Sequence, residues 1–147
     1  DGFFGHEKSY YENFLKNLPK YAVLFFATYK CVRIATAIST FCGDKAIYYF
    51  GASTSKPEYR KIMAPYLLQW EMMKYAKNNG CKTYDFLGIA PMSDNYKEGY
   101  DLQHDYAGIT QFKTRFGGYR VNYGKSGEII LNKFWYKLYR ELKKLKK

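Results

Sequence analysis

The sequence predicts an α+β fold, in which a mixed, mostly antiparallel sheet is flanked by helices. Three apolar runs of strand length follow one another closely between residues 21 and 53, and tight turns between successive strands are typical of an antiparallel meander. A helical pattern then separates this meander from a further strand. Such a strand–helix–strand unit joins parallel strands by a right-handed crossover. With 147 residues, the chain is long enough for one domain over residues 1–147.

The first third of the chain predicts a helix followed by the meander. The helix spans residues 7–18, with its apolar residues on one side and Pro19 directly after it. The expected strands are residues 21–30, 32–41 and 45–53, with turns at Lys30-Cys31 and at residues 42–44.

The rest of the chain alternates helical and extended patterns. The central helix begins at Ala64-Pro65, because proline is tolerated at the first helical position, and Gly80 is placed to end it. Its expected core residues are Leu68, Met72, Tyr75 and Ala76. The expected elements are a polar turn at 54–62, the central helix at 65–78, a strand at 83–89, a functional or mobile loop at 91–107, a short helix at 108–116, a hairpin of 119–124 and 127–132 around Lys125-Ser126, and a C-terminal amphipathic helix.

The net charge points to an anionic partner. The chain has 24 lysine and arginine residues against 13 acidic residues, a net charge of +11. The last fifteen residues, KFWYKLYRELKKLKK, carry +6 of this. A basic protein attracts nucleic acid, phosphorylated small molecules or an anionic membrane surface, and charge alone leaves all three open.

Cysteine and histidine usage argues against a disulfide framework and a metal site. The three cysteines are an odd number without CxxC spacing, and the two histidines lie far apart. A reducing, cytoplasmic compartment is therefore expected. No apolar run is long enough to span a membrane, and the N-terminus lacks a signal-peptide pattern. The chain begins without Met, so it is expected to be a fragment of a longer protein. The cysteines are Cys31, Cys42 and Cys81, and the histidines are His6 and His104.

The candidate chemistry lies where three segments are expected to converge. Ligands bind where neighbouring strands part at their ends, and the segments are residues 49–60, the end of strand 83–89 and the short helix that carries Lys113. P-loop, GxGxxG, HExxH and GxSxG motifs are absent. Asp85, on an apolar strand, either accepts hydrogen bonds from loop amides or handles protons, and the structural role is favoured. Lys113 is either a solvated surface lysine or a cation at a cleft margin beside Phe112 and Phe116.

Four segments, taken together, resemble the FemABX family of peptidoglycan interpeptide-bridge aminoacyltransferases. Each is weak alone, but their order and spacing both fit, and the match covers roughly residues 20–140. The segments are YYFGAS (48–53), APYLLQWEMMKYAKNNG (64–80), YDFLGI (84–89) and GITQFKTRFGG (108–118).

The resemblance implies a GNAT-like acyltransferase domain and a role in cell-wall synthesis. The family transfers an amino acid from aminoacyl-tRNA to the stem peptide of a peptidoglycan precursor, lipid-linked or UDP-linked. It implies no cofactor, since aminoacyl-tRNA is the donor substrate. The chain is similar to the second of the family's two GNAT-like domains. The N-terminal domain of the same protein is therefore an expected partner, and the isolated chain is expected to be inactive.

The resemblance also assigns candidate residues. Lys113 matches an active-site lysine that stabilises charge on the attacked ester carbonyl, or it holds a tRNA phosphate, and Phe112 lines that pocket. Either Tyr49 or Phe50 matches a tyrosine that contacts the peptide, and the hydroxyl contact is lost if the match is Phe50. Apart from the resemblance, Asp85 is a further candidate for substrate binding.

Two alternatives to this function stay open. Acetyl-CoA enzymes of this fold carry a glycine-rich pyrophosphate loop before the central helix, whereas SKPEYRKIMAP (55–65) has no glycine. An acyl-CoA donor is therefore disfavoured, although Arg60 and Lys61 remain candidates for a phosphate. The other alternative is a non-catalytic half that binds tRNA or precursor. The basic C-terminal helix either packs on the sheet, meets tRNA phosphates or makes peripheral contact with the inner face of the membrane.

Overall fold

The structure is a computed structural model, and it describes residues 5–123 and 127–145. The chain forms two compact units, Asp1–Arg115 and Phe116–Lys147.

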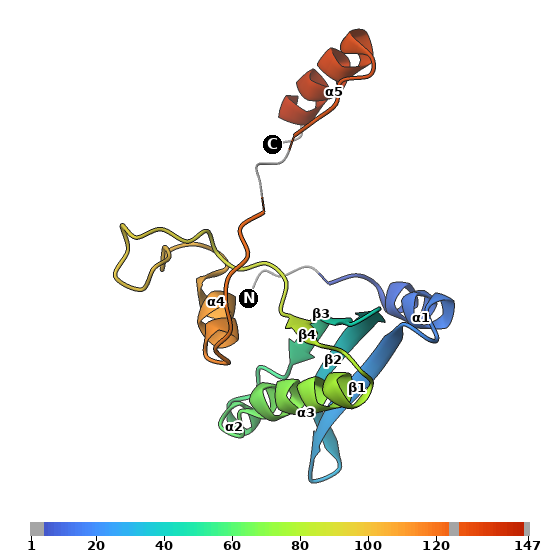
Figure 1. The fold of residues 1–147 in the computed structure, drawn as a ribbon, viewed down its shortest axis with the longest axis vertical. Helices are drawn as coiled ribbons and strands as arrows, with labels where there is room; N and C mark the ends of the chain where they lie inside the picture. Colours follow the sequence, from blue (N-terminus) through green and yellow to red (C-terminus); the bar gives the residue numbers. More distant parts are fainter. Residues whose placement is uncertain (1–4, 124–126, 146–147) are drawn as a thin grey trace. The chain divides into compact units, whose positions relative to one another are not determined.

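The first unit is built on a four-stranded mixed sheet (Figure 1). The strand order is β1-β2-β3-β4. The β1–β2 and β2–β3 pairs are antiparallel, and β4 lies parallel to β3 after the crossover through the central helix. This confirms the predicted α+β class. The strands are β1 (Ala22–Tyr29), β2 (Val32–Cys42), β3 (Lys45–Ser53) and β4 (Thr83–Asp85).

The helices of this unit are close to the predicted ranges, with one addition. A single helical turn, α2, forms where a polar turn was expected, because Pro57 opens it and Glu58 lies in its first turn. The predicted strand 83–89 is too long, since only its first three residues pair with β3. The helices are α1 (Lys8–Asn17), α2 (Pro57–Arg60), α3 (Ala64–Asn78) and α4 (Ala107–Thr114).

The core of the unit lies between α3 and β2, and Figure 1 shows α3 crossing one face of the sheet. Small side chains on β2, Ala35 and Ala37, leave room for the helix to approach closely. Leu68 and Met72 fill that space, and Met72 is 0% exposed. Leu68, Met72 and Ala76 were predicted in the core and are buried, whereas Tyr75 is 39% exposed.

The β1–β2 turn confirms the predicted hairpin and explains its shape. Lys30 and Cys31 both have positive φ, 46° and 63°. Two central residues with positive φ form a type I′ turn, whose twist matches that of the flanking strands.

A bulge in β3 decides which side chains face α1. The register shifts between Ile38 and Ser39 of β2, which pair with Phe50 and Tyr48 of β3. Tyr49 is therefore the extra residue. Tyr48 stays on the α3 side of the sheet, where its hydroxyl lies over Gly51 and would clash with a side chain there.

The second unit contains one described helix, α5 (Lys133–Leu145). The Asn132 side chain caps it by accepting hydrogen bonds from the amides of Phe134 (3.0 Å) and Trp135 (3.2 Å). The predicted hairpin is wrong for the described residues, because 119–123 and 127–132 form no strands. A two-stranded hairpin is marginal without a third strand or a covering helix. Its expected turn, Lys125-Ser126, lies outside the described residues.

Truncating Met72 should destabilise the first unit strongly. Met72→Ala leaves a cavity between α3 and β2, and we expect the free energy of unfolding to fall by about 2–4 kcal/mol. Urea denaturation measures it. The matched control is Leu67→Ala on the same helix, where the side chain is 60% exposed and we expect a loss of about 0.5 kcal/mol or less. Equal losses for the two variants would contradict this description of the core.

Candidate functional site

The candidate site begins where β3 and β4 part. Their pairing covers Lys45–Ile47 of β3 and Thr83–Asp85 of β4. Beyond that point β3 bulges and the chain after β4 leaves the sheet. A fork between neighbouring strands is where α/β proteins commonly place ligands.

Lys113 is buried against the chain that leaves β4. It lies on α4, its residue is 7% exposed, and its Nζ donates a hydrogen bond to the Gly88 carbonyl at 2.7 Å. The sequence interpretation placed Lys113 at the margin of a buried face formed by phenylalanines. The structure instead buries Lys113 more deeply than Phe112, which is half-buried.

The electrostatic surroundings of Lys113 are mixed. Burial lowers the pKa of the Lys113 amine. The negative charge of Asp85 acts in the other direction, but the net effect is a lowered pKa. The Asp85 carboxylate is in turn 4.0 Å from the Lys45 ammonium. Lys113 is therefore a partly desolvated amine with one carboxylate acting on it, rather than one half of a tight ion pair.

Asp85 organises the turn that follows β4. Its Oδ1 accepts a hydrogen bond from the Leu87 amide at 2.7 Å. Leu87 has a φ of 60°, a left-handed conformation that costs a non-glycine residue about 1–2 kcal/mol. The favoured interpretation of Asp85, as an acceptor for loop amides, is thus what the geometry shows.

Phe112 helps attach α4 to the start of α3. Its ring meets the Tyr66 ring edge-on at 5.0 Å. The Tyr66 hydroxyl accepts a hydrogen bond from the Arg115 guanidinium at 3.1 Å. Phe112 therefore lies beside Lys113 on α4 and fixes the helix that carries it.

Tyr49 and Phe50 both lie against α1. Phe14 of α1 stacks on Tyr49 at 5.3 Å and meets Phe50 edge-on at 5.6 Å. The bulge is the reason that two consecutive residues share one face. Tyr49 and Phe50 are therefore equal candidates for the position of the family's tyrosine.

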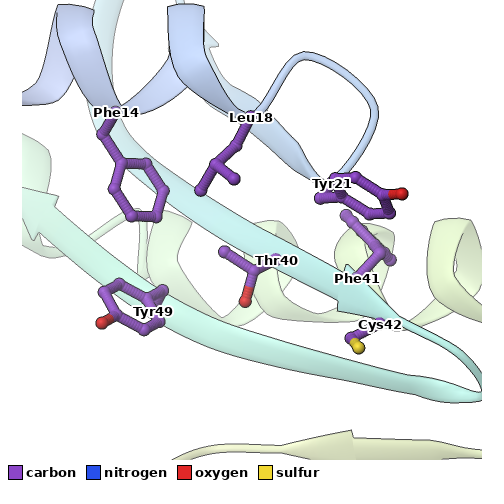
Figure 2. A pocket seen from close by; sticks show the side chains of 7 residues that line it. All are labelled: Phe14, Leu18, Tyr21, Thr40, Phe41, Cys42 and Tyr49. Atoms are coloured by element: carbon purple, nitrogen blue, oxygen red, sulfur yellow. The ribbon is translucent and has the colours of Figure 1, made fainter.

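A cavity of about 470 Å³ opens between α1 and the sheet beside Tyr49. Figure 2 shows Phe14 and Leu18 reaching from the helix toward Thr40 and Tyr49 on the strands. The lining residues are Phe14, Leu18, Tyr21, Thr40, Phe41, Cys42 and Tyr49.

The structure therefore brings together only some of the candidate residues. Lys113 and Asp85 lie at the chain that follows β4, and Phe112 precedes Lys113 on α4. Tyr49 and Phe50 pack on α1, and Arg60 is exposed at the end of α2.

Sequence reasoning missed Thr110 and a group of buried polar residues. Thr110 is 0% exposed and accepts a hydrogen bond from the Ala90 amide at 2.8 Å. Its position three residues before Lys113 was the available signal, because residues at that spacing share a helix face.

The buried polar group lies under the fork. Gln69 of α3 is 2% exposed and accepts a hydrogen bond from the Tyr84 hydroxyl at 2.7 Å. Burial raises the pKa of Tyr84, as does neighbouring Tyr48, and burial also raises the pKa of Tyr48. Both tyrosines therefore keep their protons. Tyr84 and Gln69 join β4 to α3 through a hydrogen bond between neutral groups.

The described residues contain neither a metal-ligand cluster nor a helix able to span a membrane. Within residues 5–123 and 127–145, no three His, Cys, Asp or Glu side chains cluster as metal ligands would. In the same part of the chain, no helix has the length and apolar character needed to cross a bilayer.

Solved structures that resemble this chain include FemX and an aminoglycoside acetyltransferase. FemX has a TM-score of 0.51 at 29% sequence identity, over 76% of this chain and 23% of that one. The aminoglycoside 6'-N-acetyltransferase AAC(6')-IG from Acinetobacter haemolyticus also has a TM-score of 0.51, at 14% identity over 85% of this chain and 86% of that one. The second likeness concerns the fold alone, and it confirms the predicted GNAT-like architecture.

Sequence comparison identifies relatives and a family. The chain is 32% identical over 112 residues to proteins named lipid II:glycine glycyltransferase from Staphylococcus haemolyticus and Staphylococcus aureus. Each match covers 76% of this chain, which spans about a quarter of the length of these relatives. The FemAB family model matches residues 28–144. The chain therefore belongs to the FemAB family.

Proposed function

We propose that this chain is part of an aminoacyltransferase that extends the stem peptide of a peptidoglycan precursor. The observation that carries the proposal is the buried Lys113 amine at the fork between β3 and β4, in a chain similar to lipid II:glycine glycyltransferases. The acceptor is a lipid-linked precursor, in keeping with the names of those relatives. The donor is aminoacyl-tRNA.

The proposed chemistry benefits from a cation or hydrogen-bond donor near the attacked carbonyl. An acceptor amine attacks the ester that joins the amino acid to tRNA, so a carbon–nitrogen bond forms and the ester carbon–oxygen bond breaks. The amine loses one proton and the departing tRNA hydroxyl gains one. Negative charge develops on the carbonyl oxygen during attack, and a fixed donor there lowers the barrier.

Lys113 is suited to this role by its unused donors. An ammonium has three N–H groups, and the Gly88 carbonyl accepts one of them. The remaining donors are available to an oxyanion, and the low exposure of the site strengthens such an interaction. Tight anchoring by Gly88 means that little reorganisation is needed as charge develops.

The segment before α3 argues for a donor other than acyl-CoA. Residues 55–63 contain no glycine, and they form the short helix α2 instead of an open loop of backbone amides. Arg60 at the end of α2 is exposed and can meet a tRNA phosphate. Its contribution is then electrostatic rather than a shaped pyrophosphate cradle.

This chain spans about a quarter of the length of its relatives. The proposal places a further GNAT-like domain in the same protein, N-terminal to this one, with the cleft shared between the two. Substrate contacts by Tyr49 and Phe50 belong to that shared cleft. Isolated, residues 1–147 should bind substrates weakly and lack turnover.

Replacing Lys113 should abolish most of the transfer. In the complete protein, Lys113→Ala removes one oxyanion donor, and we expect transfer to fall about a hundredfold or more, corresponding to about 3 kcal/mol. Single-turnover transfer from charged tRNA to lipid II measures it, with circular dichroism to verify folding. The control is Lys77→Ala, an exposed lysine at the end of α3. Wild-type transfer by the Lys113 variant would show that Lys113 is not catalytic.

The lowered pKa of Lys113 should make stability depend on pH. In the native state the amine releases its proton below the ordinary lysine pKa of 10.5, so the unfolded chain binds more protons in that interval. Its contribution to stability therefore rises as pH increases toward about 10.5. Urea denaturation from pH 7 to 10.5 should show this rise in the wild type and in Lys77→Met, but not in Lys113→Met. An identical pH dependence in all three would contradict the burial of a titrating amine.

The basic C-terminal segment should contribute to binding of an anionic surface. The segment from residue 133 carries +6, and α5 has apolar and basic residues on a single helix. Removing residues 143–147 should weaken tRNA binding, binding to anionic vesicles, or both, with a smaller difference at high salt. Sedimentation and filter binding at two salt concentrations separate the two partners. Unchanged affinity for both would leave this segment as a solvated surface.

A further inference from the structure

Two side chains of α4 bind the backbone that follows β4, at points two residues apart. Lys113 Nζ donates to the Gly88 carbonyl at 2.7 Å, and Thr110 Oγ1 accepts from the Ala90 amide at 2.8 Å. Thr110 and Lys113 are three residues apart and share one face of the helix. The same face thus holds one carbonyl and one amide of the segment.

The Thr110 hydroxyl both accepts and donates a hydrogen bond. It accepts from Ala90 and donates to the Tyr106 carbonyl at 2.7 Å, within α4 and its first turn. Thr110 and Ala90 are both buried, at 0% and 1% exposure. Because water does not reach either group, loss of the hydroxyl leaves the Ala90 amide without a replacement partner.

The segment held in this way is strained at its other end. Leu87 has a φ of 60°, and such conformations persist only where the surroundings impose them. Asp85 fixes the Leu87 amide from one side, and Thr110 fixes Ala90 from the other. Gly88, whose carbonyl orients the Lys113 amine, lies between these two anchors.

We propose that Thr110 is a positioning residue for Lys113. Its hydroxyl holds the Ala90 amide, which keeps the Gly88 carbonyl turned toward the Lys113 amine and keeps that amine at the fork between the strands. The catalytic part of this inference rests on the proposed function, in which Lys113 stabilises the oxyanion. The geometric part, that Thr110 controls the anchoring of Lys113, does not.

The first experiment measures turnover in the complete protein. Thr110→Val keeps the shape of the side chain but removes the hydroxyl, and Thr110→Ser keeps the hydroxyl. We expect Thr110→Val to lower kcat about tenfold or more, since small misplacements of a catalytic group have large effects, with KM for lipid II little changed. Thr110→Ser should restore kcat to near the wild-type value.

The matched control is Thr114→Val, one turn further along α4. The Thr114 hydroxyl donates only within the helix, to the carbonyls of Thr110 (2.9 Å) and Gln111 (3.3 Å). Its loss should leave kcat near wild type. Equal losses in Thr110→Val and Thr114→Val would overturn the proposal, as would failure of Thr110→Ser to restore kcat.

The second experiment does not depend on activity. Isotopically labelled acetic anhydride modifies lysine amines at a rate set by their accessibility and by the fraction that is deprotonated, and mass spectrometry compares Lys113 with exposed Lys45. Thr110→Val should raise the labelling of Lys113 severalfold relative to Lys45, whereas Thr110→Ser and Thr114→Val should not. Unchanged labelling in Thr110→Val would overturn the proposal.

The two experiments distinguish failure of the proposed function from failure of the proposed anchoring of Lys113 by Thr110. A wild-type protein that transfers no amino acid defeats the proposed function, and the labelling of Lys113 still tests its anchoring by Thr110. If Thr110→Val does not fold, Thr110→Ala replaces it in both measurements. The serine variant must in every case resemble the wild type in labelling.

Discussion

The three-residue parallel pairing of β3 with β4 is the constraint on which the rest of the first unit depends. A parallel neighbour requires a crossover, and α3 supplies it by crossing the alanine-lined face of β2. The hydrogen bond from Tyr84 to Gln69 ties β4 to that helix. Since pairing ends at Ile47 and Asp85, the backbone beyond β4 must find its partners elsewhere. It finds them in the Asp85 side chain and in the side chains of Thr110 and Lys113 on α4.

The sheet and its crossover helix could be predicted from sequence because they follow from periodicity. Met72 and Ala76 recur at helical spacing, and both are buried. The end of β4 could not be predicted in this way. Phe86 and Leu87 continue an apolar run that is typical of a strand, but the left-handed Leu87 turns the chain away. That turn depends on Asp85 and on residues of α4 more than twenty positions later in the chain.

The candidate site, too, could be predicted from the sequence only in part. The resemblance to FemABX enzymes singled out Lys113, and its position next to Phe112 on a short helix was readable from the sequence. The depth of its burial was not, because it is created by the folded-back segment that contains Gly88. The β3 bulge could not be predicted from the sequence either. An alternating strand would place Tyr49 and Phe50 on opposite faces, whereas one inserted residue puts both against α1.

Burial of Lys113 is difficult to explain by stability alone. Removing an amine from water disfavours its charged form, and the opposing Asp85 is itself shared with Lys45. A methionine would fill a similar volume without that penalty. The arrangement makes better sense for a group whose strongest partner arrives during a reaction. In the transfer reaction proposed for this chain, a developing oxyanion would restore the charge interaction that the amine lacks beforehand, so the same burial that weakens the native state would increase the difference between ground state and transition state.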